Sequence, residues 1–115
     1  MTWNQFYEIA AEAARAEPSL IHIPSDFISA CMPATLGGLT GDKAVSVVFD
    51  NTKIKRFVPG YTATVPFGQG IRRTLAWFDA DPARQQVDAE ADAAWDKLID
   101  AYERGTLAAL QYFLS

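Results

Sequence analysis

The sequence contains few of the residues that build disulfides, metal centres or catalytic triads. Its 115 residues include one cysteine, Cys31, and one histidine, His22. A lone cysteine has no partner for an intrachain disulfide, which fits a reducing compartment, and we expect a cytoplasmic protein with Cys31 as a buried thiol. No Cys/His/carboxylate cluster accompanies His22, so neither a metal nor a catalytic role is expected for it. His22 is instead expected to be half-buried on a short strand.

Long apolar runs are also absent. No stretch approaches the roughly 18–20 consecutive apolar residues that a membrane-spanning helix needs. No basic region followed by an apolar run opens the chain, so we expect no export signal. These two absences predict that the chain has no membrane partner.

Positive charge is scarce in the last third of the chain. The formal net charge is −4, and it arises entirely in residues 81–115, which carry seven Asp/Glu against three Lys/Arg. Binding to a polyanionic nucleic acid would require the opposite sign, so no nucleic-acid partner is expected. The small basic cluster Lys53, Lys55 and Arg56 is predicted to be a solvated helix face.

Half of the residues are hydrophobic, which is enough to build one modest core. The patterns predict an α+β fold, a mostly helical small lobe in a single domain over 1–115. Two short strands are expected at 19–23 and 45–49, because both stretches are apolar and bounded by turn or capping residues. A long amphipathic helix is expected to follow Pro82, with Asp81 as its cap and a break at Gly105.

The first half of the chain carries clear boundary signals. Thr2 and Gln5 form a capping-box pattern, and the helix they open is expected to bury Trp3, Phe6, Tyr7, Ala10 and Ala14. Pro24 ends the first strand, and Ser25 or Asp26 can cap a short helix that runs to Cys31. The glycines and Pro33 within residues 32–44 predict a loop.

Residues 45–78 are predicted to form a strand, a short helix, a turn and a second helix. Asp50 is expected to cap a helix that begins at Asn51 and ends before Pro59-Gly60. Pro66 suits the first turn of the second helix. Its apolar face consists of Phe67, Ile71, Leu75 and Phe78, of which Ile71, Leu75 and Phe78 are expected to face the strand at 47–49.

An ordered set of motifs in this region resembles a known family. The motifs are Asp50-Asn51-Thr52-Lys53-Ile54-Lys55, then Pro59-Gly60, then Gly70-Ile71-Arg72-Arg73-Thr74 and Ala76-Trp77-Phe78. They are similar to the C-terminal, substrate-binding lobe of extended short-chain dehydrogenases/reductases, the NAD-dependent epimerase/dehydratase family. Thr2-Trp3-Asn4-Gln5 and Ile21-His22-Ile23-Pro24 match in type and order. The resemblance covers about 2–80, with a helical extension at 81–115, and implies that the chain is a fragment of a larger enzyme.

The resemblance also implies where a substrate would bind. The candidate residues are Ser25, Asp26, Phe27, Asp42 and Lys43. Family members that use nucleotide sugars place an arginine between the proline and the Gly-Asp that correspond to Pro24 and Gly41-Asp42. No arginine or lysine lies there, which favours a smaller or less charged substrate.

The parts that would carry the family's reaction are missing from the chain. The reaction needs a Gly-rich turn for the cofactor pyrophosphate and a Tyr-x-x-x-Lys pair for proton transfer, and neither occurs. No catalytic, cofactor-binding or metal-binding residue is therefore assigned. NAD or NADP is implied only for the parent enzyme, and this chain alone is expected to be inactive.

Several residues with functional side chains are given structural roles. Asp50 is expected to be a helix cap, and Arg72 and Arg73 to lie on an outer helix face or to pair with carboxylates. The three tryptophans, Trp3, Trp77 and Trp95, are expected in the core.

Three functions remain open from the sequence. The first is the substrate-recognition lobe of such an oxidoreductase or epimerase, and the alternative is a stand-alone small α+β protein-interaction module. A nucleic-acid-associated relative is the third, and the net acidity argues against it. Exposed strand edges and the apolar segment at 107–114 also predict self-association, most simply as a two-fold dimer.

Overall fold

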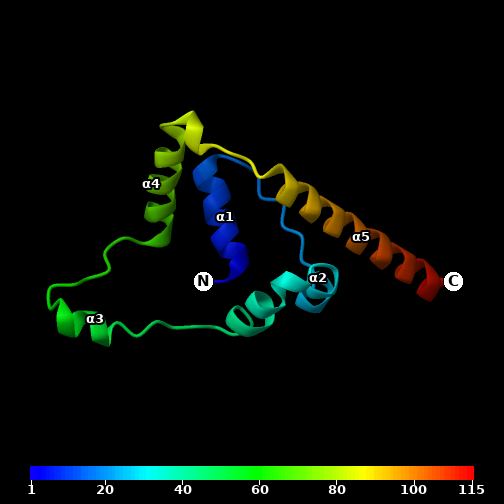
Figure 1. Ribbon diagram of the computed structural model, residues 1–115, viewed down its shortest axis with the longest axis horizontal. Helices are drawn as coiled ribbons and strands as arrows, with labels where there is room; N and C mark the ends of the chain where they lie inside the picture. The colour runs from blue at the N-terminus through cyan, green and yellow to red at the C-terminus, as the bar shows by residue number, and fades with distance from the viewer. The chain divides into compact units, whose positions relative to one another are not determined.

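The structure is a computed structural model that describes residues 1–41 and 43–115. Its helical elements, in order, are α1 (Trp3–Ala14), α2 (Ser25–Cys31), η1 (Pro33–Thr35), η2 (Gly37–Asp42), α3 (Thr52–Phe57), α4 (Phe67–Asp79), η3 (Pro82–Arg84) and α5 (Ala89–Leu114) (Figure 1). The chain divides into two units: unit 1 comprises Met1–Leu20 and Val48–Gln86, and unit 2 comprises Ile21–Val47 and Val87–Ser115. The sequence-based division at residue 80 stays a prediction.

The predicted α+β class is wrong. Within the described residues there is no strand, and the stretches at 19–23 and 45–49 lie outside the helices without strand pairing. A β-strand needs a neighbouring strand to satisfy its backbone N–H and C=O groups. Val48 is 94% exposed and Phe49 is 84% exposed, so this apolar run has no covering layer either. Its β-branched composition alone does not make a sheet.

Unit 1 begins with the helix start that the sequence predicts. The Thr2 hydroxyl accepts a hydrogen bond from the Gln5 N–H at 3.2 Å, and the Gln5 side chain accepts one from the Thr2 N–H at 2.9 Å. This reciprocal pair satisfies two backbone donors that the first turn of α1 would otherwise leave unpaired. α1 ends at Arg15, which adopts the left-handed conformation with φ of 57°.

α1 and α4 pack side by side and run in the same direction. The rings of Phe6 and Phe67 stack with centroids 4.3 Å apart, and further along both helices Glu12 and Arg72 pair at 3.6 Å. α1 therefore takes the place that the sequence analysis gave to the strand at 45–49. The expectation that α4 faces that strand is wrong, because residues 48 and 49 are solvent-exposed.

The aromatic side chains of unit 1 are less buried than predicted. Trp3 and Tyr7 lie on the outer side of α1 and are more than half exposed, whereas Phe6 and Ala10 are half-buried. Two packed helices bury only the stripe where they touch, which leaves the remaining aromatics uncovered. The prediction that the three tryptophans are core residues is wrong, since Trp77 and Trp95 are also exposed.

α3 has the predicted end, but it starts one residue later than predicted, so Asn51 occupies the N-cap position and Asp50 lies just before it. The Asp50 carboxylate accepts hydrogen bonds from the Thr52 hydroxyl at 2.6 Å and from the Thr52 N–H at 2.9 Å, and the helix begins at Thr52 rather than Asn51. The Thr52 hydroxyl and then its N–H lower the pKa of Asp50 below the ordinary 3.8, because both bonds favour the carboxylate. α4 starts directly after Pro66, as predicted.

In unit 2, α2 contacts η1, η2 and α5, and η1 contacts η2. The predicted loop at 32–44 is wrong, because two short helices occupy most of it. Hydroxyl groups stabilise these turns: Thr35 donates to the Met32 carbonyl at 2.8 Å, and Thr40 donates to the Leu36 carbonyl at 2.7 Å. Both hydroxyls thus bond to carbonyls of the preceding turn, a local pattern typical of threonine in short or irregular helical turns.

The long C-terminal helix is confirmed, but with different boundaries. Asp81 caps η3 by accepting a hydrogen bond from the Ala83 N–H, and Asp88 caps α5 through the Ala91 N–H. α5 continues through Gly105, where a break was predicted. A glycine inside a helix costs only about 1 kcal/mol relative to alanine, and the good helix formers on both sides outweigh it.

Candidate functional site

The first turn of α2 holds three of the five predicted substrate-binding residues. Ser25 and Asp26 are exposed, and the Asp26 carboxylate accepts a hydrogen bond from the Phe27 N–H at 2.9 Å. Both side chains are therefore accessible to a small molecule. Phe27 is half-buried, because its ring packs on α5. Phe27 has a structural role in this unit, and its role in substrate binding stays a prediction.

The other two predicted residues lie at the end of η2. Asp42 lies outside the described residues. The Lys43 N–H donates to the Gly38 carbonyl at 2.9 Å, and its ammonium lies over Gly38, 3.7 Å from the position that a Cβ would take there. Lys43 thus folds back on its own turn, and η2 in turn packs on α2. Ser25, Asp26, Phe27 and Lys43 all belong to unit 2, and their role in substrate binding stays a prediction.

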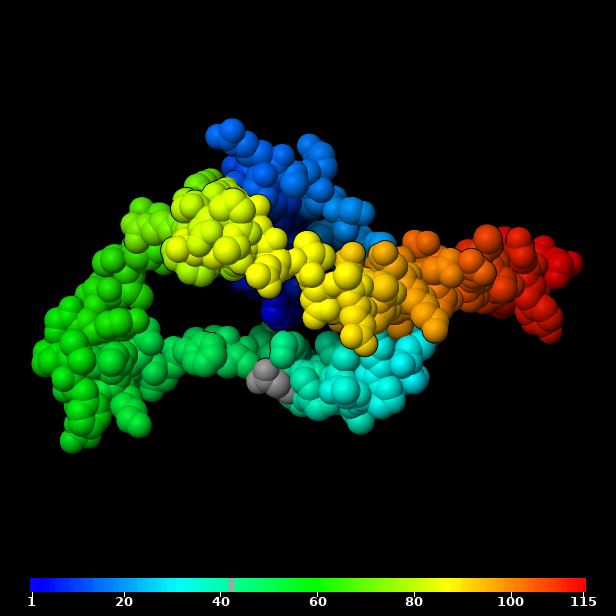
Figure 2. Space-filling view, turned by 45° about the horizontal axis from the view of Figure 1, so that its top comes forward, coloured from blue at the N-terminus to red at the C-terminus, as the bar shows by residue number. Residues whose placement is uncertain are grey.

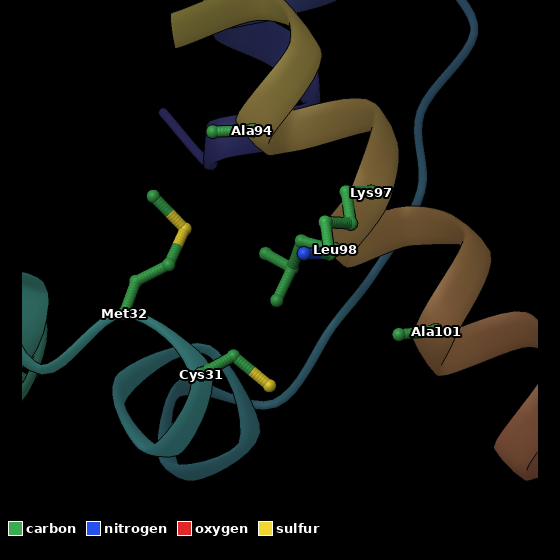
Figure 3. A pocket seen from close by; sticks show the side chains of 6 residues that line it. All are labelled: Cys31, Met32, Ala94, Lys97, Leu98 and Ala101. Carbon is green, nitrogen blue, oxygen red and sulfur yellow. The ribbon is translucent and has the colours of Figure 1, made fainter.

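A groove lies between the far end of α2 and α5, and Figure 3 shows the side chains that line it. Its volume is about 230 Å³, and its lining consists of Cys31, Met32, Ala94, Lys97, Leu98 and Ala101. Leu98 forms its floor and is only 4% exposed, the sole buried hydrophobic residue among those described. The groove lies about 9 Å along α2 from Ser25, given the 1.5 Å rise per helical residue.

The spacing of three residues on α5 indicates this groove, which the sequence analysis did not predict. Ala94, Leu98 and Ala101 recur at spacings of four and three, so they share one face of α5. The two alanines are small, and they leave space on either side of the leucine. α2 contributes Cys31, which is exposed rather than buried as predicted, because it faces this space.

The chemistry of the groove is that of a binding surface. Its lining is apolar except for the Lys97 ammonium and the Cys31 thiol, and no histidine or carboxylate lines it to act as a base. Elsewhere in the described part of the chain, no group of three or more Cys, His, Asp or Glu side chains is arranged to hold a metal ion. An apolar ligand, or an apolar ligand with one negative charge, matches this lining best.

No helix in the described residues is both long and apolar enough to cross a membrane.

Comparisons with protein-family models, curated proteins and solved structures found no match to this chain.

Proposed function

We propose that this chain is a substrate-recognition lobe of an NAD(P)-dependent enzyme similar to the extended short-chain dehydrogenases/reductases, and that it is inactive without a nucleotide-binding domain. The observation that carries the proposal is the uncovered apolar run that precedes the Asp50 cap. Val45, Val47, Val48 and Phe49 are all at least 60% exposed and unpaired. An exposed apolar run of this kind needs a cover, which a nucleotide-binding domain would supply.

The accessible surface supports a missing partner domain. The chain exposes 9827 Å² for a mass of 12.6 kDa. Two separate compact bodies, each of half that mass, would together expose about 7,500 Å². The excess is about 2,300 Å² on this chain alone, whereas large, stable interfaces bury about 2,000–5,000 Å² summed over both partners. A second domain packed on this surface would account for an excess of this size.

The exposed first turn of α2 and the neighbouring groove are the proposed contact with substrate. Ser25 and Asp26 offer hydrogen-bonding groups, and the groove offers apolar surface with a single ammonium at Lys97. No arginine fork for a diphosphate is present between Pro24 and Gly41. The proposed substrate is therefore small and carries little charge.

The proposal is tested by the reading frame upstream of Met1 in the genome. The expected result is an in-frame Gly-rich turn and a Tyr-x-x-x-Lys pair. Joined to this chain, that upstream segment should bind NAD(H) or NADP(H) in calorimetry, while the chain alone should bind neither. Upstream sequence without both motifs, or saturable cofactor binding by the chain alone, would overturn the proposal.

A second candidate function is a helical protein-interaction module. It is favoured by α3, on which no other described helix of unit 1 packs, and whose Phe57 is largely exposed. Hydrogen exchange distinguishes the two functions. In the joined protein, the enzyme-lobe function predicts slow exchange of the amides at 45–49, whereas an interaction module leaves them fast until a separate protein binds.

A further inference from the structure

The last three turns of α5 differ in charge from the rest of the helix. Residues 105–115 contain no Asp, Glu, Lys, Arg or His, whereas residues 89–104 contain five acidic and two basic side chains. The uncharged end also exposes large apolar groups: Tyr112 is 86% exposed, Phe113 is 88% exposed and Leu114 is 82% exposed. Figure 2 shows this end of α5, in red, open on the visible face. Such a surface needs a cover in water.

A groove begins where the charge ends. It has a volume of about 310 Å³ and is lined by Ile21, Tyr102, Glu103, Thr106, Leu107 and Leu110. Glu103 is the only charged residue in this lining, and it stands at the end nearest the charged part of α5. Leu107, Leu110 and Leu114 recur at spacings of three and four, so Leu114 extends the apolar face of this groove toward the end of the helix, whereas Tyr112 lies on the opposite side.

We propose that this surface is an interface between two copies of the chain, in which the ends of two α5 helices pair antiparallel about Leu110. In that arrangement Leu114 of each copy lies opposite Thr106 of the other, and Phe113 lies opposite Leu107. The apolar end of each helix then occupies the groove of its partner. Because the two contacts are identical, the interface is two-fold symmetric and closes on itself. The proposal does not rest on the proposed enzymatic function.

The charge pattern favours an antiparallel pair over a parallel one. It also favours another copy of this chain over a different protein as the partner. A parallel pair in register would place Asp100 and Glu103 beside the same acids of the partner, which is unfavourable. An antiparallel pair that overlaps only from residue 105 onward directs the two acidic halves away from each other. An uncharged surface is also complementary to itself, whereas the acidic half of α5 would need a basic partner.

The available area is sufficient for a weak dimer. A buried aromatic side chain removes about 150–250 Å² from water, so Phe113 from both copies supplies about 300–500 Å². Leu107, Leu110 and Leu114 from each copy add to this. The sum falls near or below about 1,200 Å², the range of weak, transient interfaces.

Cysteine cross-linking tests the direction of pairing. In a Cys31→Ser background, Thr106→Cys and Leu114→Cys chains are mixed under mild oxidation. The antiparallel pair predicts the mixed 106–114 disulfide as the main product, while each variant alone cross-links poorly. Preferential 106–106 and 114–114 disulfides would mean a parallel pair and would overturn the proposal.

Sedimentation over the micromolar range tests the interface itself. Intact chain should associate with increasing concentration, and Leu110→Glu should weaken association more than about 100-fold, because each copy would bury an unpaired carboxylate. Gln111→Glu adds the same charge one residue away on a different side of the helix, and it should associate like the original. Circular dichroism checks that both variants remain helical. A chain that stays monomeric at all concentrations, or association that is insensitive to Leu110→Glu, would refute the interface.

Discussion

The ring of Phe27 on α2 meets the ring of Tyr102 on α5 edge to face, with centroids 5.2 Å apart and an interplanar angle of 69°. This geometry places the positive edge of one ring against the negative face of the other. Both residues are half-buried, and Tyr102 lies one turn after the buried Leu98 on α5. The aromatic pair therefore joins the predicted substrate-binding turn of α2 to the long helix.

Removing one ring of this pair should loosen unit 2. Tyr102→Ala is expected to lower the free energy of unfolding by about 1–3 kcal/mol, less than the loss for a fully buried aromatic residue. Urea unfolding followed by circular dichroism measures the change. Phe57→Ala is the control, because that ring is 73% exposed on α3, and it should change stability by less than about 0.5 kcal/mol. Equal losses in both variants would show that the pair does not hold α2 on α5.

Leu98 is the most sensitive packing position in the described residues. Leu98→Ala should cost about 2–5 kcal/mol, because the buried leucine leaves a cavity next to an existing groove. Leu36→Ala removes the same atoms from a side chain that is more than half exposed, and it should cost little. The two midpoints of urea unfolding are compared directly. Coinciding midpoints would contradict the assignment of Leu98 to the core of unit 2.

Arg15 offers a route to a more stable chain. Its left-handed backbone conformation is unfavourable for a residue with a Cβ, and glycine adopts it freely. Arg15→Gly should raise the free energy of unfolding by about 0.5–1 kcal/mol, visible as a higher thermal midpoint. The control is Arg73→Gly within α4, where the same replacement should cost about 1 kcal/mol. The two substitutions should therefore act in opposite directions, and a destabilised Arg15→Gly variant would contradict the geometry of this cap.

The cap of α3 should depend on pH through Asp50. Hydrogen bonds from the Thr52 hydroxyl and N–H hold the pKa of Asp50 below 3.8, so the cap stabilises α3 above that pH. The stabilisation is lost as the pH falls through the lowered pKa in the folded chain. An NMR titration of the Thr52 amide should report this transition. Thr52→Val removes the hydroxyl bond and should move the pKa upward; an unchanged titration would contradict the cap.

The features that the sequence predicted correctly depend on neighbours in the chain. The Thr2–Gln5 capping box, the start of α4 after Pro66 and the end of α3 before Pro59 each arise within a few residues. The cap of α5 is Asp88 rather than the predicted Asp81, and this shift also has a local cause. Each aspartate accepts a hydrogen bond from a backbone N–H two or three residues further on. Asp81 therefore caps the short helix η3, and Asp88 caps the long helix α5.

The features that it predicted wrongly depend on distant parts of the molecule. Val45–Phe49 has strand composition, but pairing requires a second strand that the described residues do not provide. Trp3 and Trp77 lie on apolar helical stripes, yet a stripe is buried only where another element covers it. For the candidate site, Ser25 and Asp26 are exposed, and their role in substrate binding stays a prediction. The groove at Leu98 was missed because its two walls come from helices more than fifty residues apart in the chain.

The alternation of the two units along the chain has a consequence for synthesis on the ribosome. Residues 21–47 emerge from the ribosome before most of unit 1, and they can fold against α5 only after residues 48–86 have also emerged. Unit 1 can fold once residue 86 has emerged, and residues 21–47 then form a loop between its two parts. During this interval the side chains of α2 that later meet α5 stand open to chaperones and proteases. Slow translation through residues 87–115 should therefore reduce the yield of intact protein more than a pause near the start.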